Sequence, residues 1–99
     1  MAQHDLKLWP PHFDNVHNGV RTFDIRHNDR RFRAGDIIKY REFVPAEHDE
    51  HGEARYTGRS FWVRVRHVLD PLPGRDPDCG LVAGYVGLDL ALIQEGDAA

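Results

Sequence analysis

The chain has 99 residues, of which 40% are hydrophobic and 29% charged, with a formal net charge of −3 and one cysteine. This length allows one hydrophobic core, and the composition excludes a largely disordered chain. No apolar run approaches the roughly 20 residues that span a bilayer, and neither a secretory signal nor a second cysteine is visible. The sequence therefore predicts a cytoplasmic protein without a membrane partner.

The first residues predict a short strand followed by a short helix. Residues 4–8, HDLKL, alternate polar and apolar side chains, as a strand with one buried face does. A helix is expected to begin at Pro10, because proline in the first helical turn loses no hydrogen bond. Gly19 suits the position just beyond the end of this helix. The predicted core positions of the two elements are Leu6, Leu8, Phe13 and Val16.

The stretch RTFDIRH, residues 21–27, predicts a second strand. Its alternation separates an apolar face from a polar one; the two faces are Phe23 with Ile25, and Thr22 with Asp24 and Arg26. Turns are expected in the following HNDRRFRAGD, because Asn, Asp and Gly tolerate turn geometry. Within it we predict that Phe32 is buried, Asp36 is structural, and Arg31 and Arg33 face solvent.

Three more strands complete the predicted set, at residues 37–44, 59–69 and 85–93. An acidic, solvated hairpin tip separates the first two, at residues 45–58, and a Pro- and Gly-rich loop separates the last two, at residues 70–84. Five strands with one or two short helices predict a small α+β domain, mainly β. We expect its sheet to curl into a small barrel, because closure removes exposed edges. The domain is expected over residues 1–94, with a disordered tail at residues 95–99.

Charge is unevenly distributed along the chain. Residues 20–41 hold six Arg and one Lys against three Asp, whereas residues 70–99 hold six acidic residues against one Arg. Such segregation allows a positively charged face on an acidic protein. A protein that coats nucleic-acid duplexes is usually basic overall, so the net charge disfavours that class.

The stretch GVRTFDIR resembles the signature of the ASCH domain, which belongs to the PUA-like superfamily of small β-barrels. That signature reads Gly-x-Lys-x-x-Glu-x-Arg, follows a short helix and precedes a Gly-Asp pair that opens a strand. Most of the chain, including the closing GYVGLDL, is similar to one branch of small bacterial and phage ASCH-like proteins of unknown function. The positions that match this branch are His4, Leu6, Lys7, Pro10, Phe13, Arg26, Asn28, Asp29, Arg30 and Glu42.

Two positions depart from the signature. The lysine of the family is Arg21 here, and its glutamate is Asp24, so each position keeps its charge. An arginine cannot lose a proton at any working pH, whereas a lysine in a pocket can. The change at Arg21 therefore favours binding over catalysis.

The resemblance implies a cleft beside the barrel that holds RNA or a nucleotide-like ligand, including a modified nucleoside. Arginine matches phosphate groups and base edges, and a carboxylate accepts hydrogen bonds from exocyclic amines or ribose hydroxyls. Tyr40 or Trp62 is expected to supply a stacking surface. The predicted ligand-binding residues are Lys7, Arg21, Asp24, Arg26, Arg30 and Glu42.

A purely structural interpretation of the same residues stays open. Asp24 and Arg26 lie two positions apart on one strand and could simply pair with each other. Arg30 could line the cleft or stabilise the turn. Seven histidines are present, but no three possible ligands show a characteristic metal spacing, so no metal and no cofactor are predicted.

Two other functions remain as alternatives. Some ASCH proteins hydrolyse the amide of acetylated cytidine with a lysine and a threonine of the motif, and those positions hold Arg21 and Asp24 here. Arginine cannot act as a general base, so an amidohydrolase for N-acylated nucleosides would depend on Asp24 and Glu42. A protein-interaction module is the second alternative, using the acidic hairpin at residues 45–56 and Trp62. A monomer or weak dimer is expected.

Overall fold

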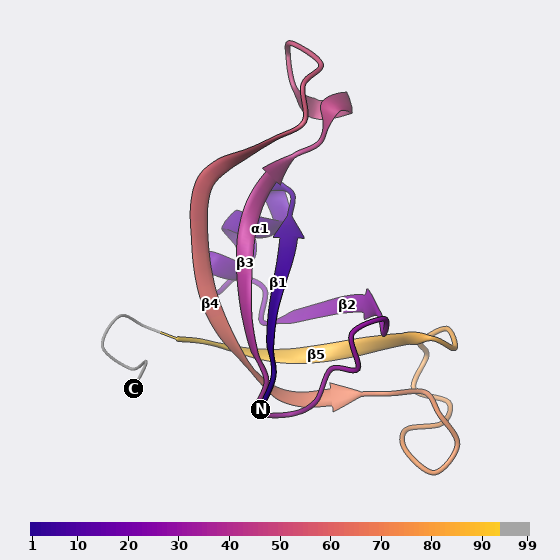
Figure 1. Cartoon of the computed structure of the whole chain (residues 1–99). Helices are drawn as coiled ribbons and strands as arrows, with labels where there is room; N and C mark the ends of the chain where they lie inside the picture. The colour runs from indigo at the N-terminus through magenta and orange to yellow at the C-terminus, as the bar shows by residue number, and fades with distance from the viewer. Residues whose placement is uncertain (94–99) are drawn as a thin grey trace.

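The computed structural model describes residues 1–93, and the predicted tail at residues 95–99 lies outside them. Its elements are β1 (Gln3–Leu8), α1 (Pro10–His17), β2 (Phe23–His27), β3 (Ile37–Val44), the short 3-10 helix η1 (Ala46–His48), β4 (Arg55–Leu69) and β5 (Tyr85–Leu92). The strands form one mixed sheet in the spatial order β1-β3-β4-β5-β2, in which β1 and β3 are parallel (Figure 1). The predicted α+β fold, mainly β, is confirmed.

The sheet curls around β4, which is long enough to pair with a different strand at each end. Residues 55–64 of β4 pair with β3, and residues 63–69 pair with β5. A register shift interrupts each ladder, after Arg41 and after Val65, and such bulges bend a strand and increase its twist. The sheet is consequently a half-barrel, with β1 and β2 as its two edges (Figure 1).

β4 begins at Arg55, earlier than the predicted start at residue 59. Its first residues are exposed on both faces, so no alternation of polar and apolar side chains marks them as a strand. They are held instead by backbone pairing with β3, where Tyr56 lies opposite Phe43. β3 and β4 thus extend together into an arm that ends in η1 and the acidic tip (Figure 1).

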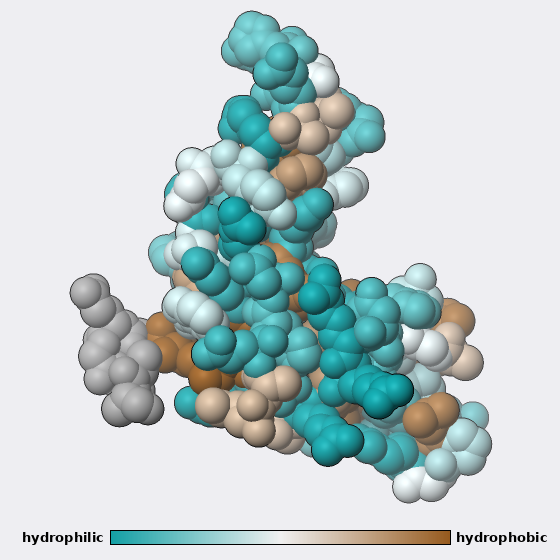
Figure 2. All heavy atoms as spheres, in the orientation of Figure 1, coloured by the Kyte–Doolittle hydropathy of each residue, from teal (hydrophilic) through white to brown (hydrophobic). Residues whose placement is uncertain are grey.

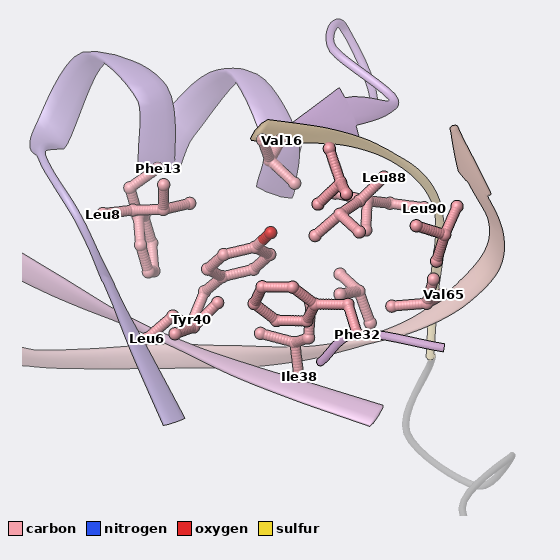
Figure 3. Packing of buried hydrophobic residues seen from close by; sticks show 13 residues of the cluster. Leu6, Leu8, Phe13, Val16, Phe32, Ile38, Tyr40, Val65, Leu88 and Leu90 are labelled. Atoms are coloured by element: carbon pink, nitrogen blue, oxygen red, sulfur yellow. The ribbon is translucent and has the colours of Figure 1, made fainter. Parts of the chain in front are cut away.

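The core lies on the concave side of the half-barrel, and α1 covers part of it. Phe13 and Val16 are buried as predicted, and Phe13 packs edge-on against Phe61 of β4, with 4.8 Å between ring centroids. Gly19 ends the helix region with a φ of +76°, a left-handed conformation that favours glycine. Alternate residues of β1, β3, β4 and β5 complete this core, including Leu6, Leu8, Ile38, Tyr40, Val63, Val65, Val86, Leu88 and Leu90 (Figure 3).

β2 buries its polar face rather than its apolar one. Phe23 and Ile25 are 52% and 50% exposed, whereas Asp24 is only 4% exposed. The register with β5 explains this orientation, because Asp24 lies opposite the buried Leu88, and side chains of directly opposed residues share a face. The polar side chains of this edge strand therefore point into the half-barrel.

Asp36 joins the start of β1 to the start of β3, which confirms its predicted structural role. Its carboxylate accepts hydrogen bonds from the backbone N–H groups of Ala2 and Arg33, at 3.0 Å and 2.9 Å. His4 Nε2 lies 2.9 Å from the same carboxylate, and its ring packs 4.7 Å from that of Phe32. Burial raises the pKa of Asp36, but the hydrogen bond with His4 and the two backbone bonds outweigh it, so the pKa falls below 3.8.

The lowered pKa predicts an acid-dependent contribution of Asp36 to stability. A carboxyl group whose pKa is lower in the folded state stabilises the fold above its unfolded pKa of 3.8, and this stabilisation is lost as the pH falls through the folded pKa. Asp36→Asn should lower the free energy of unfolding by about 1–3 kcal/mol at neutral pH. Urea unfolding of both proteins measures this difference, which should shrink as the pH falls below 3.8. A difference that stays constant over this range would contradict the assignment.

Hydrophilic residues cover most of the face shown in Figure 2, including the arm. The arm tip is acidic, and Asp49 stabilises it by accepting hydrogen bonds from the backbone N–H groups of His51 and Glu53. Within residues 1–93, no helix has the length and apolar character needed to cross a membrane.

Candidate ligand cleft

A cavity of about 500 Å³ lies along the seam between the two edges of the half-barrel. β1 and the start of α1 contribute one wall, and β2, the turn that follows it and the start of β5 contribute the other. We call this cavity the cleft. Its polar and aromatic lining residues include Lys7, Trp9, His12, Arg21, Asp24, Arg26, Arg30 and Tyr85.

The buried carboxylate of Asp24 lies at the centre of the cleft's polar network. Its Oδ2 accepts hydrogen bonds from Arg26 Nε at 2.7 Å and from the Tyr40 hydroxyl at 2.8 Å. Its Oδ1 accepts a bond from Arg21 Nη2 at 3.2 Å. The predicted pairing of Asp24 with Arg26 is present, and it forms part of a larger network that also holds Arg21.

Tyr40 enters this network from the core, where its ring is fully buried on β3 (Figure 3). Burial, followed by the charge of Asp24 and the hydrogen bond to it, raises the pKa of Tyr40 far above its usual value of 10.0. The hydroxyl therefore stays protonated and donates its proton to Asp24. Because the ring is buried, Tyr40 cannot supply the predicted stacking surface.

The guanidinium of Arg21 is fixed on three sides. It donates to the Phe23 carbonyl oxygen at 2.8 Å and to Asp24, and its Nη1 lies 3.1 Å from His12 Nδ1. Since an arginine only donates, His12 accepts with Nδ1 and carries its proton on Nε2. Three of the five N–H groups of Arg21 are thus used within the protein, and the other two make no hydrogen bond to residues 1–93.

Arg26 connects the two edges of the half-barrel. Its Nε binds Asp24 on its own strand, while its Nη2 donates to the Lys7 carbonyl oxygen of β1 at 2.8 Å. β1 and β2 are at opposite ends of the strand order, so this side chain joins two strands that share no backbone ladder. The remaining three N–H groups of Arg26 are available at the cleft.

Two predicted site residues are placed differently from the rest. Lys7 contributes its carbonyl oxygen to the cleft, but its Nζ lies over the Phe43 ring, 4.4 Å from the centroid, so its charge points toward the arm. Glu42 does not line the cleft. Its buried carboxylate accepts hydrogen bonds from Thr57 at 2.7 Å and from Arg59 at 3.3 Å.

Arg30 lines the cleft, which is one of the two positions that the sequence left open for it; the other was a salt bridge within the turn. Within residues 1–93, its side chain makes no hydrogen bond or ion pair, so it does not stabilise the turn by a salt bridge. Arg21, Asp24, Arg26 and Arg30 therefore share one cavity, which also takes in the backbone of Lys7.

The aromatic residues of the cleft are not the ones that the sequence suggested. Trp62 lies on β4 beside Lys39 and does not line the cleft. Trp9, at the junction of β1 and α1, and Tyr85, at the start of β5, do line it. Trp9 lies next to proline and Tyr85 next to a Gly-rich loop, so no alternation of polar and apolar residues marked either side chain as part of a site. Only their exposure in the folded protein identifies them as part of the cleft.

The network restricts the chemistry that the cleft can support. Both oxygens of Asp24 accept hydrogen bonds from Arg21, Arg26 and the Tyr40 hydroxyl, so the carboxylate is engaged within the protein. Glu42, its suggested partner in water activation, is engaged elsewhere. Among residues 1–93, no three His, Cys, Asp or Glu side chains are grouped as a metal ion requires. In this geometry Asp24 orients two arginines at the cleft.

The family model of DUF3850, a domain of unknown function, matches residues 3–90. The chain belongs to the DUF3850 family. No curated protein matches the sequence, so the comparison gives the family of this domain without an activity.

The buried network predicts unequal effects of two similar substitutions in the DUF3850 domain. The Asp24 side chain is 6% exposed, whereas that of Asp89, which pairs with Arg66 at 2.9 Å, is 42% exposed. Asp24→Asn should lower the free energy of unfolding by about 3 kcal/mol, because it leaves two arginines without their counter-charge. Asp89→Asn should cost less than about 1 kcal/mol. If urea unfolding gives the same loss of free energy for Asp24→Asn and Asp89→Asn, the buried network stabilises the fold no more than an exposed ion pair does.

Proposed function

We propose that this DUF3850 domain binds RNA or a nucleotide-like ligand in the cleft, and that its family is a branch of the ASCH domains of the PUA-like superfamily. The observation that carries the proposal is the arrangement of the lining. Arginine donors lie along the cleft, and an exposed aromatic residue stands on each wall. This combination of fixed cations and accessible rings suits a phosphate attached to a base.

The charge of the cleft favours an anionic ligand. Its lining holds three arginines, Arg21, Arg26 and Arg30, against the carboxylates of Asp24 and Asp29. The whole chain carries a formal charge of −3, so the cleft differs in sign from the average of the protein. The guanidinium groups of Arg21 and Arg26 are held by Asp24 before a ligand arrives, which reduces the entropy that binding must remove.

The aromatic walls favour a ligand with a flat ring. Trp9 and Tyr85 are 46% and 43% exposed, and each contacts a histidine, at 5.1 Å to His48 and 5.4 Å to His27 between ring centroids. These contacts restrict the rings without covering them. A cavity of about 500 Å³ falls in the range of pockets that hold small organic ligands. Modified nucleosides are included in the proposed ligand class, since the ASCH resemblance implies them.

The proposal also gives roles to the motif residues. Arg21, Arg26 and Arg30 contact the ligand, while Asp24 is a positioning residue whose carboxylate holds the first two. The signature Gly-x-Lys-x-x-Glu-x-Arg retains this charge pattern as Arg21, Asp24 and Arg26. A monomer or weak dimer and an additional protein partner stay predictions of the sequence.

Binding can be tested with purified protein and a panel of nucleoside 5′-monophosphates, modified nucleosides and short RNAs, followed by thermal shift and by quenching of tryptophan fluorescence. Tyr85→Ala should weaken binding about 5- to 100-fold, because it removes a stacking surface. Arg30→Ala should weaken it about 10-fold by removing a charge-assisted hydrogen bond. Neither change disturbs the Asp24 network.

The matched control is Arg64→Ala, which removes the same charge from an exposed position of β4 outside the cleft. This variant should bind as the unmodified protein does. The proposal fails if no member of the panel binds, or if Arg64→Ala and Arg30→Ala weaken binding equally.

A further inference from the structure

A second cavity, of about 510 Å³, lies on the other side of the turn that follows β2. Asn28 and residues 31–34 form one side of it, and the end of β4 with the start of the loop after it forms the other. Its charged and titratable lining residues are Arg31, Arg33, His67, Asp70 and Arg75. The proposed function assigns no role to this cavity.

The second cavity is rich in uncompensated positive charge. It holds three arginines against the single carboxylate of Asp70. That carboxylate is buried and accepts a hydrogen bond from the Leu72 backbone N–H, so it belongs to the loop rather than to the arginines. Within residues 1–93, the side chains of Arg31, Arg33 and Arg75 make no ion pair.

The backbone at Arg31 is unusual in a way that points to its side chain. Arg31 has a φ of +51°, a left-handed conformation that a glycine or asparagine adopts at less cost. The turn around it is fixed, because Asn28 Oδ1 accepts a hydrogen bond from the Phe32 N–H and the Phe32 ring is buried. The strained conformation of Arg31 is therefore maintained by the fixed turn, which holds its side chain at the second cavity.

The two cavities meet at this turn. Arg30 lines the cleft and Arg31 lines the second cavity, although consecutive Cα atoms are only about 3.8 Å apart. The same turn contributes Asp29 to the first cavity and Asn28 to the second. One thickness of backbone therefore separates two basic cavities. A chain with regularly spaced phosphates can cross it without leaving positive surface.

We infer that the two cavities form one track for single-stranded RNA, with a nucleotide in the cleft and the next phosphates of the strand over Arg31, Arg33 and Arg75. This inference rests on the proposed function of the cleft. The second cavity contains the buried Phe32 ring and the exposed His67 imidazole, so it offers three cations beside a single small exposed ring. Contacts to phosphates alone carry no sequence information. The cleft then selects the nucleotide, and the second cavity adds affinity for any connected strand.

The experiment compares two classes of probe, the four nucleoside 5′-monophosphates and the four corresponding hexaribonucleotides. Binding is measured by calorimetry and by fluorescence anisotropy at several salt concentrations. The hexanucleotide should bind more tightly than the monophosphate. Arg31→Gly and Arg75→Ala should each weaken hexanucleotide binding about 3- to 10-fold, and each should reduce the slope of log K against log salt by about 0.7. Monophosphate binding should not change.

Arg31→Gly is informative because glycine fits the backbone at this position, so the variant keeps its melting temperature while it loses the cation. Arg75→Ala removes a cation from an exposed loop position and serves as the second, independent variant. Arg64→Ala is again the matched loss of charge and should leave both probes unaffected.

The possible outcomes distinguish failure of the RNA track from failure of the proposed function of the cleft. If monophosphates bind in the cleft but hexanucleotides bind no more tightly, or if Arg31→Gly and Arg75→Ala leave the salt slope unchanged, the track is wrong and the proposed function stands. If Arg64→Ala reduces the slope as much, only net charge matters and the track is again wrong. If neither probe binds, the proposed function fails and the track falls with it.

Discussion

The hydrogen bonds of the buried Asp24 carboxylate are the constraint on which the rest of this structure depends. Tyr40 reaches Asp24 from the centre of the sheet, and Arg26 reaches both Asp24 and the Lys7 carbonyl oxygen of the opposite edge. The half-barrel is thus joined across its open seam by side chains, where a closed barrel would use a backbone ladder. Side chains span a wider gap than a ladder does, and the cleft is the space that this wider seam leaves.

The same network gives Asp24 a part in both the stability of the fold and the lining of the cleft. A buried carboxylate without partners would be very costly, and the arginines that compensate it also supply the donors of the cleft. These donors hold both oxygens of Asp24, so its carboxylate is fixed in orientation. A lysine in place of Arg21 would be able to release a proton into the cleft. Arginine at this position instead gives a rigid fork, which is an advantage for binding an anion and a disadvantage for proton transfer.

Sequence patterns predicted the strands in which apolar side chains are buried and polar side chains are exposed. They missed the features that depend on pairing between segments far apart in the sequence. The alternation in β1 predicted Leu6 and Leu8 as core positions, and the spacing in α1 predicted Phe13 and Val16; all four are buried. In β2 the alternation was present, but its hydrophobic residues face outward, because a network assembled from three other segments outweighs the burial of Phe23 and Ile25. The parallel pairing of β1 with β3, which directs the Lys7 ammonium away from the cleft, left no signal in the local sequence.

The turn after β2 shows how one short segment can serve both the fold and a binding surface. Asn28 and Phe32 fix its backbone through a hydrogen bond and a buried ring, as the turn-forming composition of the segment predicted. Between these two positions, Asp29 and Arg30 line the cleft, whereas Arg31, in its left-handed conformation, lines the second cavity. The basic residues of this segment are therefore not a single patch. They are distributed over two sides of a rigid turn, and a ligand that contacts both sides has to be a chain long enough to cross it.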